Sequence, residues 1–224
     1  MSEEPNRQAR TVATQSKLMH AMEKLCARDG VENVTVRAVV EEAGQKNESV
    51  LQYHFRNREG LIDACHKARF VQIQKKRRQM LSKCLANSPT PSMRDLCYLI
   101  VGPTFLLCKS DPGIRLWVKA FGMRNAEAQD PIIEEDVVEE NNSIRVIAEL
   151  LKDKLPHLDE QMFKNRYITV VRFLGLSLAN HSKEKNAFRG PNADFFISNV
   201  LDLLAGLFTA EVSDETRRNF DGSN

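Results

Sequence analysis

Residues 43–55 have the sequence AGQKNESVLQYHF, and the interpretation of the whole chain depends on this stretch. Gly44 is followed by a polar run and then by a short apolar patch that ends in Tyr53, His54 and Phe55. Glycine commonly ends a helix, and Asn or Ser commonly begins the next one. The stretch is either a surface turn without a function or the exposed end of a short helix that contacts a polar, patterned partner.

The segments on both sides of this stretch have helical spacing. Residues 11–28 place Leu18, Met22 and Leu25 on one face, and this pattern stops at Asp29 and Gly30. The next helix is expected to begin after Thr35, which is a good N-cap residue, and to end at Gly44.

A short third helix is expected over residues 47–53, and a long fourth helix over residues 57–87. Asn57 can cap the fourth helix, and Glu59 in its first turn suits the positive end of the helix dipole.

The remainder of the chain also has helical spacing and no alternating run of β-branched residues. Candidate helices cover residues 92–109, 113–123, 131–155, 159–184 and 192–210. Gly102 and Pro103 predict a break inside the first of these. The sequence therefore predicts an all-α protein of about nine helices. We expect a three-helix domain over residues 1–60 and a larger helical domain over residues 61–224, with the boundary inside the fourth helix.

The charge distribution is more informative than the formal net charge of +2. Residues 61–86 contain seven Lys or Arg against one acid, Asp63, whereas residues 1–60 are balanced and the rest of the chain is acidic. The basic run QKKRRQ at residues 74–79 fits a solvated helix face best, although it would also attract DNA without sequence preference.

The cysteine pattern favours a reducing compartment. Five widely spaced cysteines without a C-x-x-C pair indicate buried thiols in a cytoplasm and not a disulfide framework or a zinc site. The N-terminus is too polar for a signal peptide, and the longest apolar run has 13 residues, so no membrane association is expected.

Two short helices joined by a glycine-containing turn and braced by a longer helix form a helix-turn-helix, whose second helix lies in the DNA major groove. Its polar side chains can bind base edges; they are Gln45, Lys46, Asn47, Glu48, Ser49 and Gln52. Phosphate contacts are expected from residues near the helix ends, namely Thr35, Tyr53, His54 and Arg58, with Arg37 and Arg10 as weaker candidates.

The first quarter of the chain resembles the DNA-binding domain of the TetR family of bacterial transcriptional regulators. The resemblance covers residues 11–64 and rests on CARDG, on VENVTVRAVVEEAG, on the frame AGQ-x-N-x-S and on YHFRNREGLI. It implies a homodimeric repressor, located in the cytoplasm and on the nucleoid, that binds double-stranded DNA at a palindromic operator. It also implies that a small hydrophobic effector releases the operator when it binds the larger domain.

Two further sets of candidate residues follow from the apolar patterns of the larger domain. A ligand pocket would be lined by Met93, Tyr98, Phe105, Trp117, Phe121, Met123, Arg172 and Phe173. Arg172 would pair with a carboxylate ligand or with an acid such as Glu134 or Glu135. The stripes on the last two candidate helices belong to the core of a monomer or, as the resemblance implies, to a dimer interface; they contain Phe163, Tyr167, Val171, Leu174, Leu178, Phe196, Val200, Leu203, Leu204 and Leu207.

No catalytic motif or metal-ligand spacing is present in the sequence, so neither an enzyme nor a cofactor is predicted. The alternative to a DNA-binding regulator is a helical small-molecule carrier or enzyme whose front helices pack for other reasons. DNA binding to the region upstream of its own gene would discriminate between the two.

Overall fold

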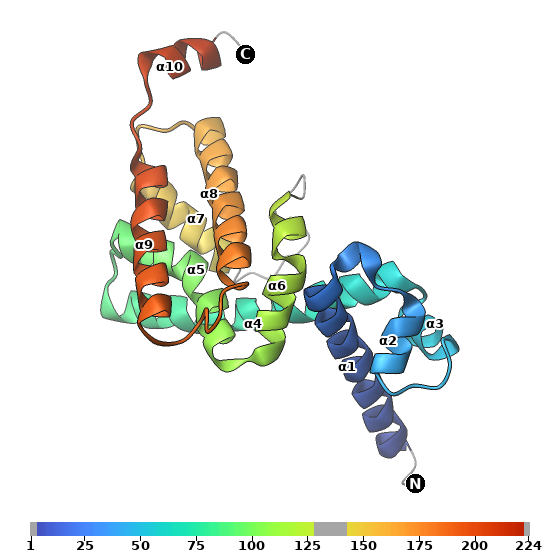
Figure 1. The fold of residues 1–224 in the computed structure, drawn as a ribbon. Coiled ribbons are helices and arrows are strands. Elements are labelled where there is room, and N and C mark those ends of the chain that lie inside the picture. Colours follow the sequence, from blue (N-terminus) through green and yellow to red (C-terminus); the bar gives the residue numbers. More distant parts are fainter. Residues whose placement is uncertain (1–3, 128–142, 222–224) are drawn as a thin grey trace.

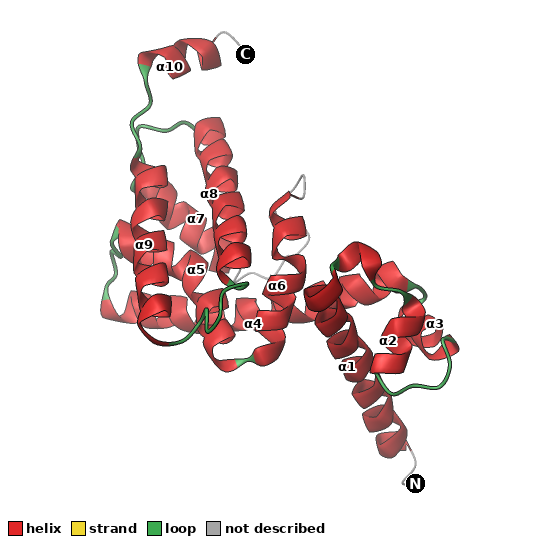
Figure 2. Cartoon of the chain, viewed as in Figure 1, coloured by secondary structure: helices red, strands yellow, loops and turns green. Residues whose placement is uncertain are grey.

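The computed structural model describes residues 4–127 and 143–221, and this part of the chain is built from helices and loops alone (Figures 1 and 2). It contains ten α-helices and one 3-10 helix: α1 (Glu4–Asp29), η1 (Val31–Asn33), α2 (Val36–Glu42), α3 (Ser49–Phe55), α4 (Arg58–Asn87), α5 (Met93–Ser110), α6 (Pro112–Glu127), α7 (Ser143–Asp153), α8 (Glu160–His181), α9 (Gly190–Thr209) and α10 (Asp214–Asp221). The predicted all-α fold is confirmed, and α10 is a helix that the sequence did not predict.

Most helix ends in the first part of the chain lie where the capping residues predicted them. The Thr35 hydroxyl accepts a hydrogen bond from the Ala38 N–H at 3.2 Å, and the Asn57 side chain accepts one from the Gly60 N–H at 2.8 Å. Gly44 ends α2 with a φ of 68°, a conformation that costs glycine little. α3 begins two residues later than predicted, because the Asn47 side chain accepts the Ser49 N–H at 2.9 Å and holds the preceding residues in a turn.

The described helices enclose two apolar cores, and α4 takes part in both. The first core lies among α1, α2, α3 and the start of α4, where Leu18, Leu51 and Leu61 are fully buried. The second lies among the rest of α4 and helices α5 to α9. Phe121 of α6 belongs to the first core, so α6 ties the two parts together. We propose that the boundary between the two domains lies within α4.

The helix break predicted at Gly102 and Pro103 does not occur. α5 continues through both residues, which are themselves buried. Proline costs a helix interior about 3 kcal/mol, and the burial of nearly every residue from Leu96 to Pro103 outweighs that cost. The candidate helix over residues 131–155 is represented by α7 alone, since residues 131–142 lie outside the described part.

The last two helices, α9 and α10, lie on the side of the molecule away from α2 and α3 (Figure 1). Among the described residues, no single helix is long and apolar enough to cross a membrane. The segments Gly190–Thr209 and Asp214–Phe220, which meet at a 62° bend, would pass that test only if they were taken together.

Candidate nucleic-acid interface and adjoining cavity

The helix-turn-helix lies at one end of the molecule, where α3 is anchored on one side and open on the other (Figure 1). Leu51 and Phe55 hold α3 against the first core, with 0% and 9% of their surface exposed. Ser49 and Gln52 are exposed, and so is Tyr53 at 76%. An aromatic side chain this exposed is unusual inside a small core-forming helix, and it provides an apolar ring with a hydroxyl at the surface.

Some of the remaining predicted DNA-contact residues have exposed side chains, and others have side chains that contact residues of the protein itself. Lys46 and Glu48 are exposed in the turn, whereas Gln45 is half-buried and donates to the Ala43 carbonyl at 3.3 Å. The half-buried His54 lies edge-on against Tyr53, with ring centroids 4.9 Å apart.

The weaker candidates also lie on exposed helix faces. Arg37 of α2 pairs with Glu41 at 2.8 Å, and Arg10 is exposed on α1. Thr35 is exposed, but its hydroxyl oxygen already accepts the capping hydrogen bond.

Arg58 turns toward the protein and not toward solvent. Its Nε donates to the Val34 carbonyl at 3.0 Å, a second nitrogen donates to the Val31 carbonyl, and a third pairs with Glu59 at 2.6 Å. The side chain therefore joins the start of α4 to the loop that precedes α2. A phosphate contact by Arg58 stays a prediction, and it would require some of these contacts to be exchanged.

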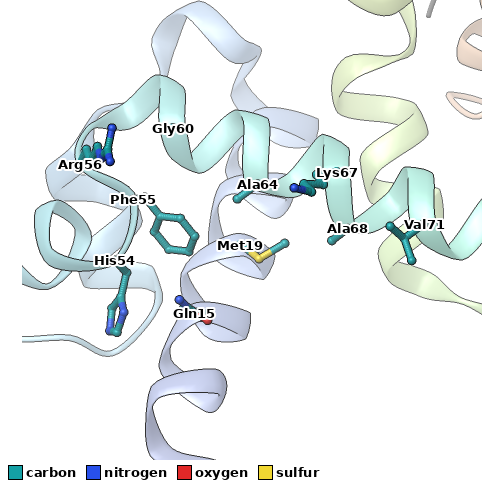
Figure 3. Close-up of a pocket in the computed structure, with 10 residues that line it drawn as sticks. All are labelled: Gln15, Met19, His54, Phe55, Arg56, Gly60, Ala64, Lys67, Ala68 and Val71. Atoms are coloured by element: carbon teal, nitrogen blue, oxygen red, sulfur yellow. The ribbon is translucent and has the colours of Figure 1, made fainter. Parts of the chain in front are cut away.

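A shallow groove runs beside the C-terminal end of α3, between α1 and α4 (Figure 3). Met19, Phe55, Ala64 and Ala68 form its apolar floor. The groove is open to solvent and has no buried polar group, so it has no feature that selects a small ligand.

A buried ion pair joins α1 to α4 where the two cores meet. Glu23 is fully buried, and its two carboxylate oxygens accept hydrogen bonds from Arg69 at 2.7 and 2.6 Å. These hydrogen bonds are the main reason why the pKa of Arg69 is raised. Asp111, immediately before α6, lies 3.8 Å from the same guanidinium. Arg69 therefore connects α1, α4 and the start of α6.

A cavity of about 800 Å³ lies between α4, α5, α6, α7 and α8. Its lining is mostly apolar and includes Asp63, His66, Lys67, Phe70, Val71, Ile73, Arg77, Ile100, Thr104, Trp117, Val118, Gly122, Ala126, Ile144, Ile147, Tyr167, Val171, Arg172, Leu174, Gly175 and Leu178. This volume is typical of a site for one drug-sized molecule.

The polar groups of the cavity lie on α4, α5, α6 and α8. Trp117 Nε1 donates to His66 Nδ1 at 3.1 Å, so His66 is neutral with its proton on Nε2. Burial lowers the pKa of His66 and also that of Arg77. Burial raises the pKa of Tyr167, so its hydroxyl keeps its proton.

Two of the eight predicted pocket residues, Trp117 and Arg172, line this cavity. Phe121 is part of the first core, and Phe105 packs against Phe188 and Phe196 in the second. The others do not line the cavity; they are Met93, Tyr98, Met123 and Phe173. Glu134 and Glu135, the acids suggested for Arg172, lie outside the described residues.

Arg77 is the cavity residue that sequence reasoning missed, because the basic run was interpreted as a solvated face. That interpretation is wrong for Arg77, whose guanidinium turns toward α5 and the cavity. Its position was detectable, since Ile73 and Leu81 lie one turn before and one turn after it and both are buried.

Most residues predicted for a dimer interface are buried within the single chain. They are Phe163, Tyr167, Leu174, Leu178, Val200 and Leu204, whereas Val171, Phe196 and Leu207 are half-buried and Leu203 is 45% exposed. The strongest apolar stripe of each helix faces its own core. The apolar side chains that remain exposed on α8 and α9 are Leu176, Phe195 and Leu203, at 36%, 70% and 45%.

The described residues contain no group of three or more His, Cys, Asp or Glu side chains arranged to hold a metal ion. Burial raises the pKa of Cys26 to about 11, so this thiol stays protonated and is a poor nucleophile.

This fold and this exposed short helix define a helix-turn-helix DNA-binding protein. Residues 18–65 match the family model described as bacterial regulatory proteins, tetR family. The resemblance noted in the sequence is therefore confirmed, and residues 18–65 form a DNA-binding domain of the TetR regulator type.

One solved structure similar to this chain is the TetR family protein CprB from S. coelicolor A3(2), with 18% identity, a TM-score of 0.45, and coverage of 90% of this chain and 100% of that chain. No curated protein matches the sequence.

Proposed function

We propose that the protein is a homodimeric repressor that binds a palindromic operator through α3 and leaves it when a small effector occupies the cavity. The observation that carries the proposal is the exposed face of α3, with Ser49, Gln52 and Tyr53 open to solvent while Leu51 and Phe55 fix the helix from behind. Such a helix can enter the major groove without any change in its own packing.

The dimer rests on a separate feature. Phe195 and Leu203 of α9 and Leu176 of α8 leave apolar area at the surface, and a two-fold contact with a second copy would bury it. Two copies would place two α3 helices one DNA turn apart, about 34–36 Å. Because it acts on the chromosome, we place the regulator in the cytoplasm.

The cavity supports the regulatory part of the proposal. It is lined by α4 and α6, and these helices also contribute residues to the first core. A ligand that favours a different arrangement of α4 and α6 would change the spacing of the two α3 helices. To move the protein from mostly bound to mostly free, the ligand must prefer the released state by about 5 kcal/mol.

Gel-shift titration with DNA from upstream of the gene, at several salt concentrations, tests the proposal. Gln52 is exposed on α3, so Gln52→Ala should weaken binding at one or two base positions by about 1–3 kcal/mol without unfolding the protein. Gln79→Ala is the matched control on the exposed side of α4 and should bind like the unchanged protein. Asn47→Ala is less suitable, since Asn47 also caps α3. A folded dimer with no DNA shift at low salt would contradict the proposal.

A further inference from the structure

The charge of the cavity wall is unbalanced. Arg77 and the exposed Lys67 line it, whereas the described residues supply one acid, the exposed Asp63. A cationic side chain in an apolar cavity destabilises the protein unless an anionic group pairs with it, because removing a charge from water is costly. The inference that follows rests on the proposed function, since it takes the cavity as the effector site.

Arg77 shows the imbalance most directly. Its Nε donates to the Leu99 carbonyl at 3.3 Å and its Nη2 to the Ile100 carbonyl at 3.5 Å, while Nη1 donates to Gln74. The two carbonyl contacts are long, and three of the five N–H donors of a guanidinium are engaged. Among the described residues, no carboxylate pairs with Arg77, so carbonyl and amide dipoles are all that balance its charge.

Tyr167 gives the same region a second donor. It lines the same cavity as Arg77, and it is 7% exposed. Its hydroxyl makes no hydrogen bond to another described residue. A phenol and a guanidinium together can donate to several oxygens of one small anionic group.

The rest of the wall is apolar and requires an apolar body. Phe70 and Ile73 of α4, Ile147 of α7, and Leu174 and Leu178 of α8 surround most of the remaining volume. We propose that the cavity binds an amphipathic organic anion whose oxyanion head, a carboxylate or a phosphate monoester, meets Arg77 and Tyr167. Its hydrocarbon part lies against these five side chains.

Probes with one hydrocarbon chain and different heads test the proposal on the full-length protein. Decanoate and decyl phosphate carry an oxyanion, 1-decanol is neutral and decylamine is cationic. Binding is followed by calorimetry and by the fluorescence of Trp117, the single tryptophan, which lies in the wall. We expect at least one of the two anions to bind at least tenfold more tightly than 1-decanol, and decylamine to bind weakest. The order of decanoate and decyl phosphate identifies which oxyanion the site prefers.

The variant Arg77→Gln distinguishes the contribution of the oxyanion head to binding from that of the hydrocarbon chain. It should weaken binding of the preferred anion roughly tenfold to a hundredfold, the range of a charge-assisted hydrogen bond, and leave 1-decanol binding unchanged. Lys75→Gln removes a charge from the exposed side of the same helix and should change neither. A melting curve of each ligand-free variant shows that the fold is retained, and Arg77→Met serves in place of Arg77→Gln if the latter melts early.

Two results would overturn the inference. If acids and alcohols bind equally and Arg77→Gln changes neither, the oxyanion head is wrong although the cavity still binds ligands and the proposed function stands. If no probe binds while the protein still shifts its operator DNA, the cavity is not a site for amphipathic anions and the effector part of the proposed function also loses its support.

Discussion

Arg69 and Arg77 lie two turns apart on the same helix, and their surroundings differ. Arg69 meets the fully buried Glu23 through two hydrogen bonds, at 2.7 and 2.6 Å, which raise its pKa. Arg77 meets two carbonyl oxygens and an amide, and burial lowers its pKa. The protein supplies the counter-charge at the first position and leaves it to another molecule at the second.

This difference separates two uses of a half-buried cation. At Arg69 the pair is complete, and its effect is to hold α1 against α4 at the junction of the two cores. At Arg77 the charge is only partly compensated, which costs stability in the ligand-free protein and provides binding energy once an anion arrives. One helix thus combines a fixed connection to the DNA-binding helices with a wall of the cavity.

Of the substitutions that test this difference between Arg69 and Arg77, the removal of Arg69 should have the largest effect on stability. Arg69→Met would leave Glu23 buried without its cation, and the free energy of unfolding should fall by about 3–5 kcal/mol. Urea unfolding measures the loss. The double variant Glu23→Leu with Arg69→Met should recover most of it, because neither charge is then left alone. A double variant as unstable as the single one would show that Arg69 acts through packing and not through its charge.

Arg58 provides an intermediate case, since it meets two carbonyls and an exposed acid. Arg58→Met should lower the free energy of unfolding by about 1–2 kcal/mol, less than the range for two charged hydrogen bonds because the side chain is 23% exposed. The salt dependence of DNA binding separates its two possible roles. A phosphate contact would reduce the slope by about one unit, whereas a purely structural role would leave the slope unchanged. Arg58→Lys is the control that keeps the charge.

A lower pH should produce the smallest of these effects. The arginines keep their charge at every pH used, whereas the protonation of His66, three residues before Arg69, changes. Burial is the main cause that lowers the pKa of His66 in the folded protein, while the unfolded chain binds a proton near pH 6.5. The unfolded state therefore holds more protons as the pH falls through about 6.5, and the free energy of unfolding should decrease there and level off below the folded pKa.

The loss at His66 should be of the order of one hydrogen bond, about 1 kcal/mol, because protonation of Nδ1 removes the acceptor for Trp117. Urea unfolding at pH 8 and pH 5.5, followed by Trp117 fluorescence, measures it. His66→Gln should show a smaller difference between the two pH values, and an equal difference would assign the acid sensitivity to other groups.

The sequence predicted the local features of this molecule well because local chemistry determines them. Thr35 and Asn57 cap helices by contacts three residues away, and Gly30 and Gly44 end helices through their own backbone conformation. The break predicted at Pro103 failed because burial of α5 depends on neighbours that are distant in the sequence.

The cavity was predictable only in part for the same reason. Trp117 and Arg172 were proposed from residue type and from the apolar pattern around them, whereas Phe105 and Phe121 have equally suitable side chains and pack into cores instead. Periodicity reports that a face is apolar but not whether a neighbouring helix or an empty volume covers it. The DNA contacts proposed on α3 stay predictions, since the side chains are placed but no DNA is present.

The contact between α6 and α8 has a consequence for what the cavity can admit. A Cβ added at Gly122 would lie 2.8 Å from the Cβ of Ala179, so the two helices touch almost backbone to backbone beside the cavity. A ligand too wide for the space meets helix main chain at this wall and not a side chain that can rotate away. This wall therefore excludes ligands by their width, whatever the chemistry of their head group.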